Sequence, residues 1–266
     1  MSILKNDSPI GFFDSGVGGL TVLKHFKNLL PNENIIFFGD TAHVPYGEKT
    51  KDQLVEYSKN ILSFFDEKNC KAVVMACNTT SSLIYDCIKP LYDFELYPIV
   101  QSVAKVLAQL PVSRLGVFAT KATITSKAYE KSINKYNPQI KIYGQFCPEW
   151  VKIVETNSAK EMTNIHIIKE DLMRMLKNSP DKIVLGCTHY PYLLPVLAEF
   201  APKDLFIDPS ISFAEFLKND LGSKNLLKMS SSPATDEFYV SSNPKQFRES
   251  AKMFYDLGKE PELVIF

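Results

Sequence analysis

The sequence has no surplus of charge, no long hydrophobic run and few cysteines. Lys and Arg together number 30, as do Asp and Glu, so the formal net charge at pH 7 is zero. Without a basic surplus there is no overall field to hold a polyanion, which argues against nucleic acid or an anionic membrane as partner. No stretch approaches the roughly 18 apolar residues of a membrane span, and the first ten residues show no apolar secretion signal. We therefore expect a cytoplasmic protein.

The five cysteines are too few and too scattered for a disulfide framework or a structural zinc site. They stand at positions 70, 77, 87, 147 and 187, and no two of them form a Cys-x-x-Cys pair. An odd number of dispersed cysteines is typical of free thiols. We expect no metal, and any functional cysteine would act through its thiol.

What the sequence does contain is the pattern of an α/β protein. Hydrophobic residues make up 45% of the 266 residues, which is enough for a full core. Short apolar runs alternate with longer segments of helical periodicity, such as 50–68 and 161–176. Continuous apolar strands between helices are typical of a mostly parallel sheet flanked by helices. The predicted strands lie at 10–13, 35–38, 72–76, 114–118, 140–143, 183–186 and 205–207.

An internal echo indicates two similar halves. The run 10–13 resembles 115–118 at an offset of 105 residues, and 73–77 resembles 183–187 at an offset of 110. Repeated elements of this kind predict two comparable α/β lobes. We assign residues 99–208 to the second lobe, and residues 1–98 with 209–266 to the first. The return to the first lobe is suggested by a short strand, a helix at 244–256 and a final strand at 263–266.

Four polar clusters follow predicted strands, where functional residues of parallel sheets gather. The clusters contain no arginine, so an acidic substrate would be held by backbone N–H groups and by hydroxyl and amide side chains. With Asp14 or Asp40 available for an ammonium group, this combination describes an amino-acid pocket. The clusters are Asp14-Ser15-Gly16, Asp40 to Gly47, Cys77-Asn78-Thr79 and Cys187-Thr188-His189.

Cys77 and Cys187 differ from the other cysteines in their positions. Each ends a predicted buried strand and opens a predicted helix, where unpaired N–H groups and the helix dipole lower the pKa of a thiol. A free cysteine is often only a small buried hydrophobic residue, and we assign Cys70, Cys87 and Cys147 to packing for that reason. Two cysteines at matching positions of similar halves are harder to explain by packing alone, so we expect both to be reactive.

Four motifs together resemble the glutamate racemase family of cofactor-independent amino-acid racemases. They are FDSGVGGLTV at 13–22, GDTAHVPYG at 39–47, ACNTTS at 76–81 and LGCTHYP at 185–191, and their order and spacing match along nearly the whole chain. The resemblance implies two α/β lobes with the active site in the cleft between them. It also implies production of D-glutamate for peptidoglycan synthesis in a bacterium, with no cofactor. Both a monomer and a homodimer are compatible with it.

The resemblance further implies roles for individual residues. Cys77 and Cys187 correspond to the two cysteines that act as acid and base, Cys77 toward D-glutamate and Cys187 toward L-glutamate. Asp40, Glu155 and His189 stand where the family has residues that assist the thiols. The departures are Lys152 in place of an expected proline, Thr80 in place of alanine, and Gln101-Ser102 in place of a glycine. The positions that match substrate-binding residues are Asp14, Ser15, Tyr46, Gly47, Asn78, Thr79, Thr188 and His189.

Racemisation at an α-carbon needs one group to remove the proton and another, on the opposite face, to return one. Thiols suit this task because their ordinary pKa, about 8.5, is close to neutrality. One alternative is a racemase of aspartate or a related acidic amino acid. A thiol redox protein is a second, although Cys77 and Cys187 lack a local resolving cysteine. A two-lobed binding protein is a third, in which paired cysteines would be superfluous.

Overall fold

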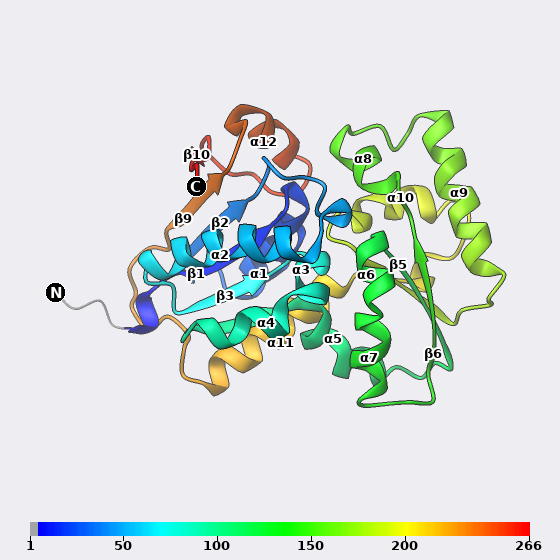
Figure 1. Ribbon diagram of the computed structural model, residues 1–266, viewed down its shortest axis with the longest axis horizontal. Coiled ribbons are helices and arrows are strands. Elements are labelled where there is room, and N and C mark those ends of the chain that lie inside the picture. Colours follow the sequence, from blue (N-terminus) through cyan, green and yellow to red (C-terminus); the bar gives the residue numbers. More distant parts are fainter. Residues whose placement is uncertain (1–4) are drawn as a thin grey trace.

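A computed structural model describes residues 5–266, which form two parallel β-sheets flanked by helices (Figure 1). The first sheet has the strand order β10-β9-β2-β1-β3-β4, and the second has the order β6-β5-β7-β8. Every pairing between neighbouring strands is parallel. The predicted α/β class is confirmed.

Most strands coincide with the predicted runs, but β4 (Glu95–Pro98) was not predicted. Its short run ends in a proline, which is found in sheets mainly on edge strands, and β4 is an edge strand of the first sheet. The last strand is shorter than predicted. The first sheet contains β1 (Ile10–Asp14), β2 (Ile35–Gly39), β3 (Ala72–Met75), β4, β9 (Asp236–Val240) and β10 (Glu262–Leu263). The second sheet contains β5 (Arg114–Ala119), β6 (Lys141–Phe146), β7 (Lys182–Gly186) and β8 (Phe206–Ile207).

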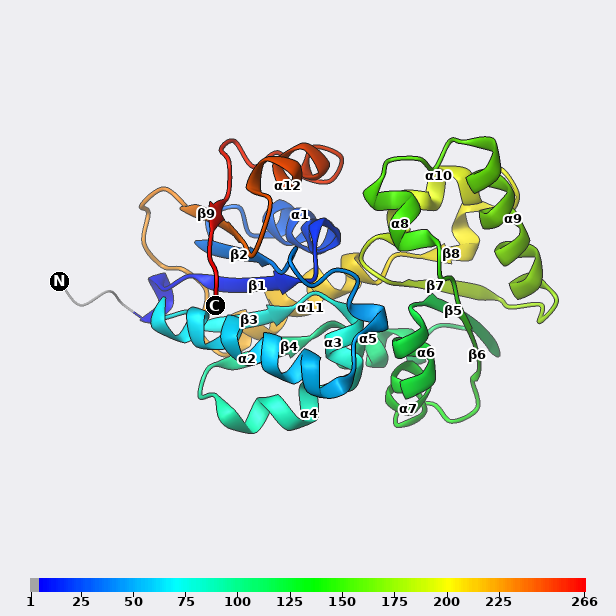
Figure 2. The same ribbon diagram turned by 45° about the horizontal axis from the view of Figure 1, so that its top comes forward.

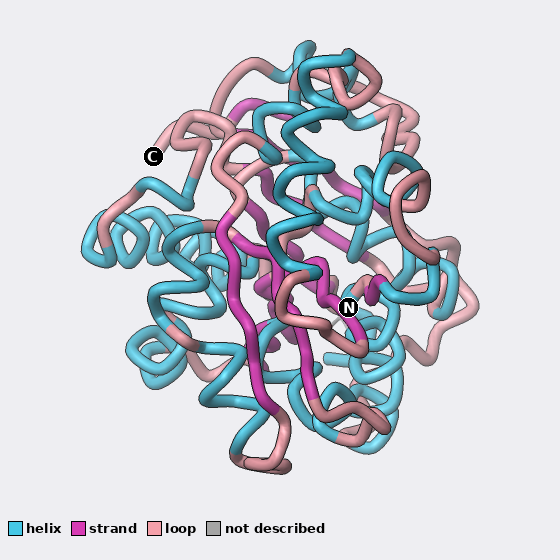
Figure 3. The backbone as a smooth tube through the Cα atoms, turned by 90° about the vertical axis from the view of Figure 1, so that its right-hand side faces the viewer, coloured by secondary structure: helices cyan, strands magenta, loops and turns pink. Residues whose placement is uncertain are grey.

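Helices cover both faces of the sheets, as Figures 2 and 3 show. None of the helices within residues 5–266 is both long enough and apolar enough to cross a membrane. In the first part of the chain they are α1 (Leu20–Leu29), α2 (Lys51–Glu67), α3 (Asn78–Leu83), α4 (Tyr85–Ile88) and α5 (Ile99–Ala108). Those that follow β5 are α6 (Lys121–Ser126), α7 (Ala128–Asn134), α8 (Trp150–Glu155), α9 (Met162–Leu176), α10 (Leu194–Leu197), α11 (Pro209–Ser223) and α12 (Pro244–Ala251).

The first sheet is buried on both faces because successive side chains of β1 point to opposite sides. Phe12 meets Phe26 of α1, with ring centroids 5.0 Å apart. Phe13 faces the other side and meets Phe65 of α2, with centroids 6.5 Å apart. Both faces therefore need apolar residues, which is why β1 reads as a continuous apolar run rather than an alternating one.

The internal echo has a structural counterpart in the order of the strands. The order β2-β1-β3-β4 in the first sheet is repeated as β6-β5-β7-β8 in the second. Cys77 follows β3 and Cys187 follows β7, so the two cysteines occupy equivalent positions. Strands before Pro98 and after Asp208 belong to the first sheet, and the strands between them belong to the second. The lobe boundaries at 98/99 and 208/209 stay a prediction.

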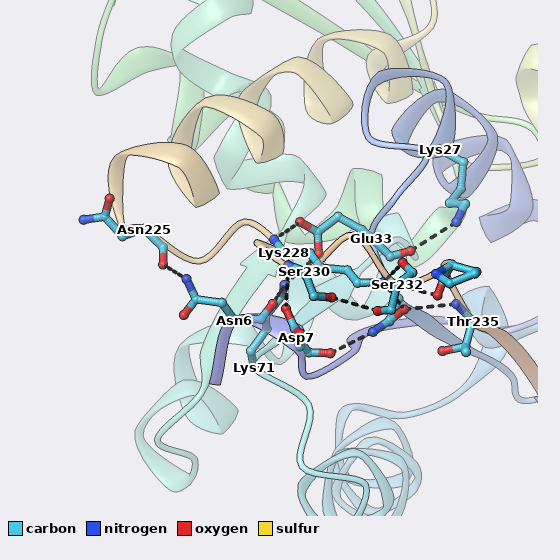
Figure 4. Close-up of polar contacts among 12 residues, drawn as sticks. Asn6, Asp7, Lys27, Glu33, Lys71, Asn225, Lys228, Ser230, Ser232 and Thr235 are labelled. Carbon is cyan, nitrogen blue, oxygen red and sulfur yellow. Dashed lines mark hydrogen bonds and ion pairs between the residues drawn. The ribbon is translucent and has the colours of Figure 1, made fainter. Parts of the chain in front are cut away.

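A buried polar network joins the returning segment 225–235 to the rest of the first lobe (Figure 4). Lys71 Nζ lies 2.6 Å from Glu33 Oε2, and both side chains are buried. Glu33 Oε1 accepts a hydrogen bond of 2.6 Å from the backbone N–H of Lys228. Removing one partner of such a buried ion pair costs about 3–5 kcal/mol, because the other charge is left unpaired. The network therefore holds the last part of the chain against the lobe.

Candidate active site

A small cavity lies between the polar loops of the two lobes. Its volume is about 20 Å³, the space of about one water molecule. Both cysteines line it, together with most of the predicted substrate-binding residues. The lining residues are Ser15, Pro45, Tyr46, Gly47, Cys77, Asn78, Thr79, Thr120, Val151, Cys187, Thr188 and His189.

Cys77 is the residue immediately before α3 and is 5% exposed. Burial raises the pKa of its thiol to about 12, and nearby Asp14 adds to the increase. The backbone N–H groups of Thr79 and Thr80 lower the pKa, as the helix position predicts, but they do not outweigh burial. The expectation of a lowered thiol pKa is therefore wrong for Cys77, because desolvation disfavours the thiolate more than two N–H groups favour it.

Cys187 has a different neighbour. Its Sγ atom lies 3.8 Å from Nδ1 of His189, whose Nε2 lies 2.6 Å from Oε1 of Glu155. Burial of the imidazole lowers the pKa of His189, but its hydrogen bonds to Cys187 and Glu155 together raise that pKa well above its ordinary value. Glu155, His189 and Cys187 thus form a chain in which an imidazole of raised pKa lies beside the sulfur. This places two of the predicted assisting residues at one thiol.

Asp14 lies one layer behind the cavity lining rather than in it. Its side chain is fully buried, and its carboxylate accepts hydrogen bonds from the backbone N–H of Gly16 and from Thr188 Oγ1, each at 3.1 Å. Burial raises the pKa of the Asp14 carboxyl, against the lowering effect of His189. Both of its oxygens are engaged by these donors, so Asp14 orients Thr188 in this structure. Its role in binding the substrate stays a prediction.

Asp40 also lies behind the lining, under Tyr46. Its carboxylate accepts hydrogen bonds from the phenol of Tyr46 and from Ser241 Oγ, the latter at 2.7 Å. His43 Nδ1 lies 2.9 Å from both carboxylate oxygens. In this structure Asp40 thus orients Tyr46, and its predicted role of assisting the thiols stays a prediction.

Asn78 and Thr79 present polar groups from the first turn of α3. Thr79 Oγ1 lies 3.0 Å from Oγ1 of Thr120, across the two lobes. Asn78 is 2% exposed, and within residues 5–266 no hydrogen-bond partner faces its Nδ2 atom. An unpaired buried donor beside a cavity is a feature of a site that expects an acceptor from a ligand.

No group of three or more His, Cys, Asp and Glu side chains in the described part of the chain is placed to hold a metal ion. The cavity instead combines two thiols with hydroxyl, amide and imidazole groups. Such a set can bind a carboxylate and exchange protons with a bound molecule.

Comparison with known proteins identifies the family. The family described as Asp/Glu/Hydantoin racemase matches residues 20–216. The chain belongs to this family. Glutamate racemase from Thermoanaerobacter sp. (strain X514) is 39% identical, over 97% of this chain and 96% of its own. Glutamate racemase from Nostoc sp. (strain PCC 7120 / SAG 25.82 / UTEX 2576) is 37% identical, over 91% of this chain and 83% of its own.

The fold agrees with this membership. The crystal structure of glutamate racemase from Francisella tularensis subsp. tularensis SCHU S4 in complex with D-glutamate matches with a TM-score of 0.89. It is 33% identical to this chain, and the match covers 98% of each protein. The predicted membership of the aspartate/glutamate racemase family is confirmed, and with it an amino-acid racemase.

Several residues that line the cavity or lie behind its lining were not predicted. Thr120 lines the cavity, and the internal echo could have revealed it, since Ser15 corresponds to Thr120 at the offset of 105 residues. Tyr129 lies behind Asn78, and no motif marks it. Pro45 and Val151 supply apolar lining, for which polar patterns give no signal.

Two departures from the family pattern now have a structural setting. Gln101 Nε2 donates a hydrogen bond of 2.9 Å to the backbone oxygen of Ser81, and Ser81 Oγ donates one of 2.8 Å to Gln101 Oε1. This pair joins α5 to α3, the helix that carries Asn78. Thr80 Oγ1 donates a hydrogen bond of 3.1 Å to the backbone oxygen of Cys77. Lys152 is exposed on α8, and nothing in the structure explains that substitution.

Proposed function

We propose that this protein interconverts L-glutamate and D-glutamate without a cofactor, using Cys77 and Cys187 as its two acid/base groups. The observation that carries the proposal is that thiols from two lobes, at equivalent positions after β3 and β7, line one cavity. Approach from two lobes suits a reaction in which a proton leaves one face of the α-carbon and another arrives at the opposite face.

The proton transfers balance over one turnover. The Cys187 thiolate removes the α-proton of L-glutamate, and the electron pair left on the α-carbon delocalises into the α-carboxylate. The Cys77 thiol then delivers its proton to the opposite face, which produces D-glutamate and leaves a Cys77 thiolate and a Cys187 thiol. The reverse reaction begins from that state. A pKa of about 12 keeps Cys77 protonated in the free protein, which suits it for delivery.

The remaining residues bind and orient the substrate in this proposal. Hydroxyl groups of Ser15 and Thr79 and the amide of Asn78 donate to the carboxylates. Backbone N–H groups also donate, among them that of Thr188, whose hydroxyl hydrogen is donated to Asp14. Donors held in place before the reaction stabilise the charge that develops on the carboxylate. Tyr46, Gly47 and His189 complete the lining, while Asp14, Asp40 and Glu155 hold Thr188, Tyr46 and His189.

The small volume of the cavity bears on the mechanism. A space of about 20 Å³ does not admit glutamate, so the two lobes must separate for the substrate to enter. Return of the lobes around glutamate would remove water from the reacting α-carbon and strengthen the hydrogen bonds that surround it. We therefore expect binding to be coupled to movement of one lobe against the other.

We place the activity in the cytoplasm, where D-glutamate would supply peptidoglycan synthesis. Glutamate is the proposed partner, and neither nucleic acid nor a membrane is expected to bind. The named relatives are glutamate racemases, which favours glutamate over the aspartate alternative. Light scattering on the purified protein distinguishes a monomer from a homodimer.

The test is racemisation by purified protein after dialysis against a chelator, followed by polarimetry with L-glutamate, D-glutamate or L-aspartate as substrate. We expect both glutamate enantiomers to racemise without added cofactor. Cys77→Ala and Cys187→Ala should each lose activity in both directions, whereas Cys70→Ala and Cys147→Ala, which alter buried cysteines outside the lining, should keep it. Racemisation of aspartate alone, or substantial activity in Cys77→Ala, would overturn the proposal.

A further inference from the structure

The amide of Asn78 offers a single free donor group to the cavity. Its Oδ1 atom accepts a hydrogen bond of 2.7 Å from the phenol of Tyr129, and both residues are buried. Within the described part of the chain Nδ2 has no partner. An asparagine amide turned by 180° would exchange these two atoms and present an acceptor instead of a donor. The direction of the amide therefore decides what the cavity offers to a ligand.

The phenol of Tyr129 favours the direction that is observed. Its bond to Asn78 is the one side-chain hydrogen bond that Tyr129 makes within residues 5–266. If the amide turned, the phenol would accept from Nδ2, and its own hydrogen would be buried without an acceptor. An unmade hydrogen bond in a buried site is unfavourable. The phenol therefore donates to Oδ1, and Nδ2 is the atom left for the ligand.

The two residues come from different lobes. Asn78 begins α3, beside the first sheet, and Tyr129 lies in α7, beside the second. Because the hydrogen bond crosses from one lobe to the other, it forms only when the lobes are together. The direction of the amide is consequently set in the closed arrangement, when the substrate would be enclosed.

We propose that Tyr129 is a positioning residue, which orients Asn78 so that Nδ2 donates a hydrogen bond to a carboxylate of bound glutamate. This inference rests on the proposed function. A donor facing a carboxylate favours binding, whereas an acceptor facing it repels the negative charge. Tyr129 does not line the cavity, so it acts through Asn78 and not by contact with the substrate.

The test compares Tyr129→Phe, Asn78→Ala, the double variant and the unaltered protein. Tyr129→Phe should lower kcat/KM for glutamate about tenfold. An Asn78 amide that is no longer oriented would lose its hydrogen bond to the charged carboxylate of glutamate, and such a loss is of that order. In the Asn78→Ala background the same substitution should change kcat/KM less than about twofold, because no amide remains to orient. If the Tyr129 phenol acted through any residue other than Asn78, its loss would have the same effect in both backgrounds, and the inference would be wrong.

A matched control separates orientation from stability. Tyr97 is also buried, and its phenol donates a hydrogen bond of 2.7 Å to Asp220 outside the cavity. Tyr97→Phe should therefore lose stability without a change in kcat/KM. If turnover by Asn78→Ala is too slow to measure, the same four proteins can be compared by their dissociation constants for D-glutamate, measured by calorimetry. Cys77→Ala is then added to each of them to stop turnover.

The outcomes distinguish the inference from the function on which it rests. Absence of glutamate racemisation by the unaltered protein contradicts the proposed function. Normal racemisation by the unaltered protein, with kcat/KM unchanged in Tyr129→Phe, contradicts only the role of Tyr129.

Discussion

The Nδ1 atom of His189 lies 3.8 Å from the Sγ atom of Cys187, whereas the thiol at the equivalent position in the other lobe has a carboxylate for a neighbour. Asp14 helps to raise the pKa of Cys77, while His189 itself has a raised pKa and can carry a positive charge. Two equivalent strand ends thus present their thiols to opposite electrostatic surroundings. In the free protein this favours a protonated Cys77 opposite a Cys187 that has a cationic partner.

The role of Glu155 gives the first prediction. In Glu155→Gln, His189 loses a charged hydrogen-bond partner, so the pKa of its imidazole should fall toward the ordinary value. We expect kcat/KM to fall about tenfold to a hundredfold, the range for a hydrogen bond to a charged group. Proton NMR titration of the His189 ring and initial rates measure the two effects.

The loss in Glu155→Gln must be equal in the two directions. L- and D-glutamate have the same free energy in water, so their equilibrium constant is one, and the ratio of the two kcat/KM values cannot change. Any difference between directions has to appear in kcat and KM separately. Glu161→Gln alters an exposed carboxylate immediately before the next helix, α9, and should leave the rates unchanged. An unaltered His189 titration in Glu155→Gln would contradict the role of this carboxylate.

The second prediction concerns the chemical reactivity of Cys77. A thiol is protonated below its pKa, and a pKa of about 12 means that the thiolate fraction rises tenfold with each pH unit across the neutral and mildly alkaline range. Alkylation of Cys77 by iodoacetamide, followed by mass spectrometry of its peptide, should accelerate accordingly from pH 7 to pH 10. Asp14→Asn removes a negative neighbour and should speed alkylation at pH 8. A plateau below pH 9 would show that the thiol ionises far more easily.

Most of the fold could be predicted because its strands are buried on both faces and read as continuous apolar runs. Tertiary packing decides which residues of a helix are covered, and the sequence pattern does not contain that information. The helical periodicity over 161–176 includes Met162, but this residue stands at the first position of α9 and is 87% exposed. Cys87 was assigned to packing, and it is exposed on α4. The spacing of apolar residues identifies the apolar face of a helix, but not how far along the helix neighbouring elements cover that face.

The cavity lining could largely be predicted because its polar residues follow strand ends. What could not be predicted is which carboxylates face the cavity and which lie behind it. Asp14 and Asp40 stand beside lining residues in the sequence, yet their oxygens are engaged by Thr188 and Tyr46. Tyr129 is distant from every motif and reaches Asn78 only because the lobes meet. Such contacts depend on three-dimensional packing, which no local pattern encodes.

The third prediction tests the close packing of the glycine loop against the cavity. A Cβ atom added at Gly18 would lie 2.5 Å from Thr188 Oγ1 and 2.6 Å from His189 Nδ1, so both of these side chains, or the glycine loop itself, would have to move. We expect Gly18→Ala to lose on the order of 100-fold in kcat/KM, since small misplacements of catalytic groups have effects of that size. Circular dichroism should show that the fold persists.

Gly222→Ala is the matched control for that substitution. An added Cβ atom there would lie 3.6 Å from Leu227, at an ordinary contact distance, within α11. Its activity should be unchanged, and alanine in a helix should add up to about 1 kcal/mol of stability. Equal activity of Gly18→Ala and Gly222→Ala would show that the close approach of Gly18 has no catalytic consequence.

The last prediction follows the hydrogen at the α-carbon, which reports on the placement of the two thiols. In two-base catalysis the group that removes the proton differs from the group that delivers the new one. With L-glutamate in deuterium oxide, the Cys77 thiol carries deuterium before it delivers, so D-glutamate formed early should contain deuterium at Cα. Recovered L-glutamate should remain largely protiated. Deuterium can enter L-glutamate only if Cys187, which removed the proton, delivers a solvent-derived hydrogen back to the same face of the α-carbon. Proton NMR and mass spectrometry on the separated enantiomers measure both pools. A single base moving between the two faces would return part of the original protium to the product. Protium retained in early D-glutamate would therefore mean that Cys77 and Cys187 do not serve opposite faces. Exchange of L-glutamate faster than product appears would mean the same.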